Sequence, residues 1–378
     1  MPCLNEADTL AACIEQARLG IQRSGLRGEI LVADNGSHDE SVLIAEKLGA
    51  RVVHVKEEGY GNALGAGIRA ASGKWIVIGD ADESYDFSET DRFVEKLQQG
   101  FELVMGCRLP QGGGRILPGA MPFSHRWIGN PLFSRMAKHM FAAPIHDVYC
   151  GLRGFTQSLY DRLELRCEGM EFATEMIVKA SLHGARIAEI PITLHPDGRK
   201  THAPHLRTVR DGWRTLRFFL IFSPRWLFLT PGFILAMLGL AGYAVALPRL
   251  TIGGVTFDAH TLLFSSLAIM MGYQSVLFAI CAKTFAISEG LLPRDPRMDR
   301  FFKVIYLERG LAIGVVAFLA GLILLGVAVL QWKAAHFGRL DYAVTMRWVI
   351  PGATLTALGF QTVLSSFFVS ILGMKRRP

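Results

Sequence analysis

The stretch Lys-Trp-Ile-Val-Ile-Gly-Asp-Ala-Asp-Glu-Ser-Tyr-Asp-Phe, residues 74–87, joins a short apolar run to two carboxylates, Asp80 and Asp82. An uninterrupted apolar run is typical of a strand buried on both faces of a parallel sheet. Ligands bind beyond the carboxyl ends of such strands, and Mg²⁺ takes one or two protein carboxylates while substrate phosphates complete its shell. The stretch therefore predicts a site for a metal and a diphosphate. For Asp-x-Asp alone, a solvated turn is an equal or better interpretation, so the rest of the chain has to decide.

Hydrophobic residues make up 51% of the 378 residues, which exceeds the share in an ordinary soluble enzyme. The excess follows Pro224, in four stretches nearly free of charge at residues 227–247, 261–287, 311–330 and 349–374. Each is long enough to cross a hydrocarbon core of about 30 Å, which takes about 20 residues. We predict a soluble domain at 1–203, an amphipathic interface helix at 204–225 and an all-α transmembrane domain of four helices at 226–378.

The basic residues between these stretches predict an orientation, because cytoplasmic loops are enriched in Lys and Arg. The connection between the first two spans has only Arg249, and the chain ends on Lys375-Arg376-Arg377. The connection between the second and third spans carries Arg294, Arg297, Arg300, Lys303 and Arg309. The last connection is less clear, with Lys333, Arg339 and Arg347. We expect both termini and the soluble domain on the cytoplasmic side.

The cysteines and the net charge indicate which cellular compartment and which binding partners to expect. The six cysteines show no paired or metal-ligand spacing, so we expect free thiols in a reducing compartment. The first residues lack the apolar run of a signal peptide. A net charge of +7 raises nucleic acid as a partner, but the basic residues concentrate near the membrane segments. Anionic lipid headgroups explain them better, and we expect no nucleic-acid partner.

Apolar and helical patterns alternate in the first part of the chain. Strands are predicted at 29–33, 52–55, 75–78 and 103–105, and helices at 40–48, 63–71 and 90–99. This alternation is typical of a doubly wound parallel sheet with helices on both faces.

Two further motifs follow predicted strands. The turn at 34–39 brings Asp34 to a strand end, where it can accept hydrogen bonds from a base or a ribose, although a simple helix cap is the favoured interpretation of the turn alone. The glycine-rich segment at 59–67 leads into a helix and can bring backbone amides to a phosphate. Close helix packing explains the glycines equally well, since glycine repeats are weak evidence.

Seven motifs occur together in one order. They are Pro2-Cys3-Leu4-Asn5-Glu6, Asp34-Asn35-Gly36-Ser37-x-Asp39, Gly59-x-Gly61-Asn62-Ala63, Asp80-x-Asp82, Gly106-Cys107-Arg108, Asp147 with Gly151-Leu152-Arg153, and Gly169-Met170-Glu171-Phe172-x-x-Glu175. In this order they resemble the family 2 glycosyltransferases. The resemblance is greatest to the polyprenyl-phosphate group, which includes dolichyl-phosphate mannose and glucose synthases, and it covers residues 1–225.

The resemblance implies an α/β nucleotide-sugar fold of the GT-A type and a divalent metal, Mg²⁺ or Mn²⁺. It also implies that one sugar passes from a UDP- or GDP-sugar to a polyprenyl phosphate, with inversion at the anomeric carbon. Carried over by position, Asp80 and Asp82 hold the metal, and Arg108 and Arg153 lie by the phosphates. Glu175 faces the acceptor side. The nucleotide pocket takes Pro2, Asn5, Glu6, Asp34, Gly61 and Asp80.

The chemistry agrees with these residue types. A polyprenyl phosphate is already ionised near neutral pH, so a strong general base is less necessary than for transfer to a hydroxyl. Stabilising the leaving diphosphate and holding two anionic reactants together is an electrostatic and positional task, which suits a metal and the bidentate donors of arginine. An isolated arginine is nevertheless more often a surface ion-pairing residue.

A basic, amphipathic run follows the last predicted strand at 189–192. Residues 204–220 carry Arg207, Arg210, Arg214 and Arg217 beside an apolar stripe of Leu206, Val209, Trp213, Leu216 and Leu220. This pattern predicts a helix that lies in the membrane interface. We predict that Arg199 and Lys200, just before it, meet the phosphate of the lipid acceptor. A plain membrane anchor without acceptor contact is the alternative.

Two departures from the family pattern stand out. The family's Pro-x-x-Asn-Glu motif follows an apolar strand, whereas here Met1 begins the motif, so either the first central strand is missing or the true start lies upstream. The acidic turn reads Ala33-Asp34-Asn35 where the family has paired aspartates, which leaves Asp34 alone to meet the nucleoside.

Three hypotheses remain open from the sequence. The first is the single-sugar polyprenyl-phosphate transferase. The second is a processive polysaccharide synthase, disfavoured because neither Pro224-Arg225-Trp226 nor Met346-Arg347-Trp348 provides a Gln-x-x-Arg-Trp motif. The third is a non-enzymatic flippase or scaffold for lipid-linked sugars, against which the intact Asp80, Asp82 and Arg108 argue. The sugar, the base, the lipid length and the oligomeric state stay open, although small residues in the spans would allow a homo-oligomer.

Overall fold

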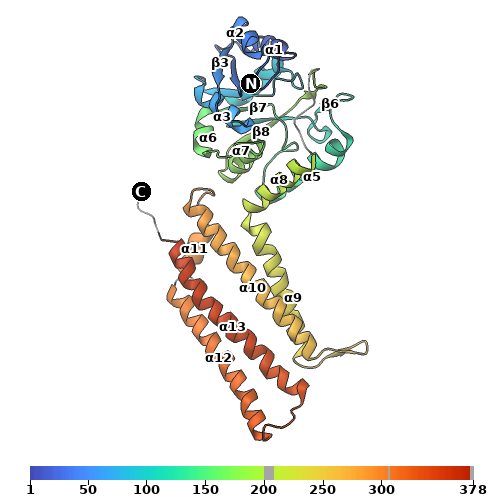
Figure 1. Ribbon diagram of the computed structural model, residues 1–378, viewed down its shortest axis with the longest axis vertical. Coiled ribbons are helices and arrows are strands. Elements are labelled where there is room, and N and C mark those ends of the chain that lie inside the picture. The colour runs from blue at the N-terminus through green and yellow to red at the C-terminus, as the bar shows by residue number, and fades with distance from the viewer. Residues whose placement is uncertain (200–207, 305–306, 375–378) are drawn as a thin grey trace. The chain divides into compact units, whose positions relative to one another are not determined.

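The computed structural model describes residues 1–199, 208–304 and 307–374 (Figure 1). The chain divides into two compact units, Met1–Phe219 and Leu220–Pro378. The prediction of an α/β domain of the GT-A type followed by an all-α membrane domain is confirmed by this architecture.

Strands and helices alternate along the first unit, as the sequence predicts. The strands are β1 (Pro2–Cys3), β2 (Leu31–Asp34), β3 (Arg51–His54), β4 (Trp75–Ile78), β5 (Leu103–Cys107), β6 (Arg115–Ile116), β7 (Arg153–Thr156), β8 (Ile187–Pro191) and β9 (Thr193–Leu194). The α-helices are α1 (Leu10–Ser24), α2 (Ser41–Lys47), α3 (Tyr60–Ala70), α4 (Thr90–Gln98), α5 (Asn130–Phe141), α6 (Gln157–Leu163), α7 (Glu171–Leu182) and α8 (Thr208–Ile221). Short helical turns lie at η1 (Phe87–Glu89), η2 (Pro110–Gly112) and η3 (His125–Gly129), the last of them a π-helical turn.

Two sheets form the centre of this unit. In the first, β1, β2 and β3 run parallel, with Pro2 opposite Ala33. In the second, the order is β4-β7-β5-β8, where β5 and β8 are parallel and β7 is antiparallel to both neighbours. The expectation of a wholly parallel sheet is therefore wrong for β7. The reason is that β7 begins opposite Met105, near the end of β5, and so runs back along it.

The strand that carries the first motif is short and lies at an edge of its sheet. β1 has two residues, and β2 and β4 are not paired with one another. Residues of both strands line a cavity of about 390 Å³. The Met1 amino group donates a hydrogen bond of 2.8 Å to the Leu31 carbonyl oxygen, and burial lowers its pKa to about 6.

Local sequence explains why these elements form. Leu10, Ile14 and Ala17 recur at helical spacing on α1 and are buried, and the helix ends at Gly25, whose φ of 67° suits glycine. All five residues of β5 are buried, which fits a strand covered on both faces.

The second unit is helical. It contains η4 (Arg225–Leu229), α9 (Thr230–Ala246), the hairpin strands β10 (Thr251–Ile252) and β11 (Val255–Thr256), α10 (Ala259–Ser288), α11 (Pro296–Val304), α12 (Leu307–Ala334) and α13 (Tyr342–Leu372). Four segments of the described chain are long and apolar enough to cross a membrane: Arg225–Ala246, Ala259–Ser288, Leu307–Ala334 and Tyr342–Leu372. The predicted four spans are confirmed, within a few residues at each end.

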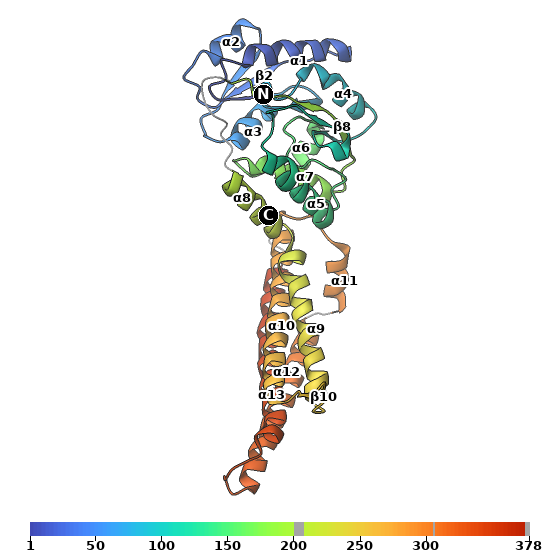
Figure 2. The same ribbon diagram turned by 90° about the vertical axis from the view of Figure 1, so that its right-hand side faces the viewer.

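The long helices pack as two antiparallel pairs, α9 with α10 and α12 with α13 (Figures 1 and 2). Buried small residues recur every seventh position, as in Gly232, Gly239 and Ala246 on α9, and Gly314, Gly321 and Ala328 on α12. A Cβ added at Gly359 would lie 2.4 Å from the Phe318 backbone nitrogen. These glycines therefore let the helix backbones touch.

Hydroxyl groups connect the two helix pairs. Tyr243 of α9 hydrogen-bonds with Thr354 of α13 at 3.4 Å, and Tyr273 of α10 hydrogen-bonds with Thr362 of α13. At one end of α13, Arg347 donates to Asp258 at 2.9 Å.

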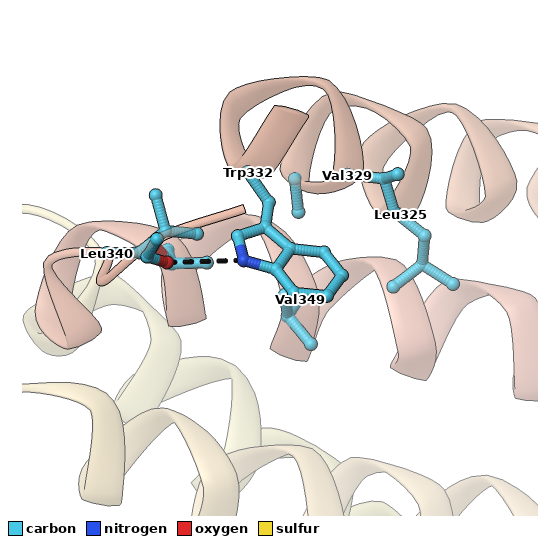
Figure 3. A pocket seen from close by; sticks show the side chains of 8 residues that line it. Leu325, Val329, Trp332, Leu340 and Val349 are labelled. Atoms are coloured by element: carbon cyan, nitrogen blue, oxygen red, sulfur yellow. Dashed lines mark hydrogen bonds between the residues drawn. The ribbon is translucent and has the colours of Figure 1, made fainter. Parts of the chain in front are cut away.

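An apolar pocket of about 510 Å³ lies between α12 and α13 (Figure 3). Trp332 lines it and donates its indole hydrogen to the Gly338 carbonyl oxygen at 3.2 Å.

Candidate functional site

Several of the predicted site residues lie at or after the carboxyl ends of strands. Asp34 ends β2, Asp80 follows β4, and Arg108 follows β5. Arg153 begins β7 at the same edge, opposite Ile78 and Met105. Since ligands of α/β sheets bind at this edge, the strand ends define the candidate site.

Asp80 is partly buried against an aromatic hydroxyl. Its Oδ1 accepts a hydrogen bond of 2.8 Å from Tyr60, and a Cβ added at Gly151 would lie 2.6 Å from its Oδ2. Burial, together with the negative charge of Asp82, raises the pKa of Asp80 to about 6. A divalent cation between the two carboxylates would relieve both effects.

Asp82 belongs to a cluster of carboxylates around one arginine. Arg199 donates to Asp82 Oδ2 at 3.2 Å, to Glu6 Oε1 at 3.1 Å and to Asp197 Oδ2 at 2.6 Å. The Gly198 amide also donates to the Asp82 carbonyl oxygen at 3.0 Å. Arg199 therefore lies with the predicted metal ligands rather than free in solvent.

The donor set fits a metal that is shared with a substrate. Within residues 1–199, 208–304 and 307–374, no group of three or more His, Cys, Asp or Glu side chains could hold a metal by itself. Two aspartates supply only part of a shell, which is the way Mg²⁺ is bound when phosphates and water complete its coordination.

Arg108 is held rigidly beside this pair. Asp147, which is fully buried, accepts from Arg108 Nε at 2.7 Å and from Nη2 at 2.8 Å. The remaining terminal nitrogen, Nη1, lies 3.5 Å from the Tyr85 hydroxyl, which in turn accepts a hydrogen bond of 2.9 Å from the Gly151 amide. The bidentate pair fixes the guanidinium plane, and Nη1 is the guanidinium nitrogen that does not bond to Asp147.

Arg153 is placed differently from the prediction. Its side chain is fully buried and donates to the backbone carbonyl oxygens of Cys150, Val148 and Ala173. Burial lowers its pKa. This geometry gives no support to a role beside the phosphates, because the guanidinium is used to tie β7 to α7 and to the loop before it.

Glu175 is also internal. Its Oε1 lies 2.9 Å from Lys179 Nζ, and its Oε2 accepts hydrogen bonds from the amides of Arg166 and Cys167 at 2.9 and 2.8 Å. Glu175 is about 1% exposed, and its carboxylate supports the 166–168 loop.

Gly61 packs closely against the 166–168 loop. A Cβ at Gly61 would lie 2.4 Å from the Cys167 carbonyl oxygen, and the Gly61 amide donates to the Glu168 carbonyl oxygen at 2.8 Å. The glycine is needed for close packing at the start of α3, the alternative that the sequence left open.

The predicted nucleoside residues meet at the ends of β1 and β2. Asn5, with a φ of 58°, accepts from the His38 amide at 2.8 Å. Asp34 accepts from the Ser37 amide at 3.1 Å and lies 3.4 Å from His54 Nδ1. Pro2 pairs opposite Ala33 in the same sheet. These residues shape one short stretch of the sheet edge.

Lys200 lies outside the described residues, as do Leu206 and Arg207 of the predicted interface helix. On the described part of α8, Arg210, Trp213, Arg217 and Ile221 are exposed, whereas Thr215, Phe218 and Phe219 are buried. The exposed face is thus mixed basic and apolar.

Sequence reasoning missed two tyrosines and the role of one aspartate. Tyr60 and Tyr85 direct their hydroxyls at Asp80 and Arg108, and Asp147 orients that arginine. Tyr60 stands between two glycines and Tyr85 follows Asp82 by three residues, so a polar aromatic inside each motif was the available signal.

Comparison with known proteins agrees with these motifs. Residues 1–164 match the family model for glycosyl transferase family 2, and residues 280–373 match the family 2 C-terminal transmembrane region. The low-salt glycan biosynthesis hexosyltransferase Agl6 of Haloferax volcanii is 35% identical over 99% of this chain and 88% of its own length. A dolichyl-phosphate hexose transferase of the same organism is 31% identical over 44% of this chain and 69% of its own.

Among solved structures, glucosyl-3-phosphoglycerate synthase from Mycobacterium tuberculosis, in complex with Mn²⁺ and UDP, is similar at 20% identity with a TM-score of 0.43. It covers 58% of this chain and 75% of that one. The match to Agl6 extends through both units. The chain therefore belongs to glycosyltransferase family 2 and is an integral membrane protein that carries the family's C-terminal transmembrane region.

Proposed function

We propose that this protein transfers a single sugar from a UDP- or GDP-sugar to a polyprenyl phosphate, with inversion, at the cytoplasmic face of the membrane. The observation that carries the proposal is the Asp80–Asp82 pair at the end of β4, enclosed by Arg108 and Arg199. Two carboxylates and two guanidiniums in one place suit two phosphate-bearing reactants and a shared cation. The similarity to a dolichyl-phosphate hexose transferase supports the proposal of a lipid phosphate as acceptor.

Asp80 and Asp82 would hold Mg²⁺ or Mn²⁺, which when bound neutralises charge on the leaving diphosphate. Arg108, fixed by Asp147, adds a positive charge that need not reorganise during the reaction. Pro2, Asn5, Glu6 and Asp34 would line the nucleoside pocket. Arg153 and Glu175 act as positioning residues, which hold β7 and the loop against Gly61.

Arg199 would connect the two reactants. Arg199 pairs with Asp82 and Glu6, which we assign to the donor. An acceptor phosphate that reaches Arg199 would therefore also lie beside the donor diphosphate. Such placement of two anions is the main requirement for transfer to an acceptor that is already ionised. Lys200 would add a second cation to the acceptor.

The first experiment supplies the purified full chain with a polyprenyl phosphate, Mg²⁺ or Mn²⁺ and a panel of UDP- and GDP-sugars, and measures sugar in the lipid phase. Metal-dependent labelling by one sugar, lost in Asp82→Asn but kept in Asp91→Asn on α4, supports the proposal. A long polymer would indicate a processive synthase. No sugar transfer by folded protein would favour the hypothesis of a non-enzymatic flippase or scaffold.

A second experiment tests Arg199 without substrate turnover. Arg199 competes with a cation for Asp82, so Arg199→Ala should bind Mn²⁺ about 5-fold more tightly, the equivalent of about 1 kcal/mol. Electron paramagnetic resonance of free Mn²⁺ measures the affinity in the absence of nucleotide. Arg92→Ala, which removes an exposed pair with Glu89, is the control. Unchanged Mn²⁺ affinity in Arg199→Ala would separate Arg199 from the metal site.

A further inference from the structure

One charged side chain interrupts the apolar strand β8. Glu189 lies between Ala188 and Ile190, opposite Met105 of β5, and its side chain is 11% exposed. A carboxylate placed so deeply needs polar partners, because burying an unpaired charge is costly. The partners of Glu189 therefore indicate what it does.

Glu189 holds a loop through the backbone of that loop. Its Oε1 accepts hydrogen bonds from the amides of His146 and Asp147 at 2.7 and 3.1 Å. Its Oε2 lies 2.7 Å from Nδ1 of His146. Both carboxylate oxygens are thus used by two consecutive residues of the connection between α5 and β7. Hydrogen bonds to a charged acceptor are about twice as strong as neutral ones, so these bonds fix the connection to β8.

The next residue of the connection is fixed as well. The Val148 amide donates to the Ser134 hydroxyl of α5 at 3.0 Å, and the Val148 carbonyl oxygen accepts from Arg153 Nη2 at 3.0 Å. Residues 146–148 are therefore held by β8, α5 and β7 together. A hydrogen-bond network of this kind restricts all its members, so the segment is rigid.

Asp147 connects this segment to Arg108. Its Oδ2 accepts the backbone amide of Arg108 at 3.0 Å as well as Nε, and its Oδ1 accepts Nη2. Asp147 can orient Arg108 only while its own backbone stays in place. Glu189, which holds that backbone, thus determines where the guanidinium of Arg108 lies.

Arg108 is joined to β8 in two ways. The first is the sheet, because β5 and β8 pair in parallel with Cys107 opposite Pro191, and Arg108 follows Cys107. The second is the path through Asp147 and Glu189. Only the second path depends on side chains, so a substitution can remove it without removing the strand pairing.

We propose that Glu189 is a positioning residue for sugar transfer, which fixes Arg108 through the backbone of His146 and Asp147. The proposal rests on the proposed function, in which Arg108 stabilises the leaving diphosphate. A fixed positive charge is effective only while it stays where negative charge develops. A looser loop lets Arg108 move, and a displacement of about 1 Å can cost about 100-fold in rate.

Three substitutions of Glu189 in the purified full chain separate its position from its charge. Glu189→Ala should lower kcat for sugar transfer by about 10- to 100-fold, with the KM for the nucleotide sugar changed less. Glu189→Gln keeps an oxygen for the two amides and should stay within about 5-fold of the wild type. Glu189→Asp keeps the charge but withdraws it from the amides, and should be slower than Glu189→Gln. The reverse order, with Glu189→Asp faster, would overturn the proposal.

Glu102→Ala is the matched control. Glu102 accepts the Arg186 amide at 3.1 Å, just before β5 and β8 begin and therefore at the other end of the same strands. The kcat of Glu102→Ala should remain that of the wild type. An equal loss of kcat in Glu102→Ala and Glu189→Ala would indicate a general loss of the sheet and would overturn the proposal.

A double substitution tests whether Glu189 acts through Arg108. In an Arg108→Lys background, Glu189→Ala should lower kcat by less than about 3-fold further, because the bidentate group that it positions is already gone. If Glu189→Ala causes its full loss of kcat again in this background, Glu189 acts elsewhere and the proposal is wrong.

The position of Arg108 can also be measured without turnover, by nuclear magnetic resonance. In ¹⁵N-labelled protein, the Nε–H signal of Arg108 is the one lost in Arg108→Lys, and Glu189→Ala should speed its exchange with water by about 10-fold or more. Unchanged exchange would overturn the proposal. Faster exchange without any sugar transfer by the wild-type chain would support the link between Glu189 and Arg108 and would contradict the proposed function instead.

Discussion

The two units of this protein use buried polarity in opposite ways. In the soluble unit, Asp147, Arg153, Glu175 and Lys179 are almost fully buried and fix loops through ion pairs and backbone hydrogen bonds. In the membrane unit, the buried positions are mainly glycine and other small residues, and the ion pairs lie at helix ends, as between Arg347 and Asp258. The difference follows from the solvent, because lipid provides no hydrophobic drive between helices and backbone contact must replace it.

The two units should be destabilised by different kinds of substitution. In the soluble unit, removing one charge leaves another buried without its partner. In the membrane unit, adding even a small side chain separates two helices. We therefore expect the largest losses of stability in the soluble unit when a charged side chain loses its partner. In the membrane unit we expect them when a small residue is replaced by a larger one.

The largest effect is expected from Asp147→Ala. This change leaves Arg108 buried without its carboxylate, which costs about 3–5 kcal/mol. Urea-dependent hydrogen exchange of peptides from β5 and β7 measures the loss. Glu15→Ala, which removes a pair with Arg18 that is half exposed, should cost no more than about 1 kcal/mol. Similar losses in both variants would show that buried charge does not distinguish the soluble unit.

The next effect concerns the glycines of the membrane unit. Gly359→Val places a side chain against the backbone of Phe318 and should cost about 1–3 kcal/mol or more. Gly326→Val on α12 is the control, because a Cβ there meets nothing within 4 Å. Resistance to unfolding in detergent mixtures measures both. Equal stability of the two variants would contradict the role of close helix contact.

The smallest effect comes from one substitution made in both regions. Thr9→Val removes a buried hydrogen bond of 2.6 Å to the Ala81 carbonyl oxygen and should cost about 1–3 kcal/mol. Thr362→Val removes the bond with Tyr273 in the membrane unit and should cost about 0.6 kcal/mol, since such bonds average little in lipid. Hydrogen exchange of α1 and of α13 gives the two values. A larger loss of stability in Thr362→Val than in Thr9→Val would contradict the expectation that hydrogen bonds contribute less in the membrane unit.

Features that depend on local pattern could be predicted from the sequence alone. The apolar run before Asp80 and Asp82 predicts a strand that ends in carboxylates, and four uncharged stretches predict four spans, because length and periodicity are read along the chain. The order of the motifs predicts the family, and the match to Agl6 confirms it.

The contacts of each charged side chain could not be predicted and became known only from the three-dimensional fold. Arg108, Arg153 and Arg199 look alike in sequence, yet one is held by Asp147, one by three carbonyl oxygens and one by Asp82 and Glu6. Burial and ion pairing depend on segments far apart in the chain, so the physical role of these residues emerges only when the sheets and helices bring them together.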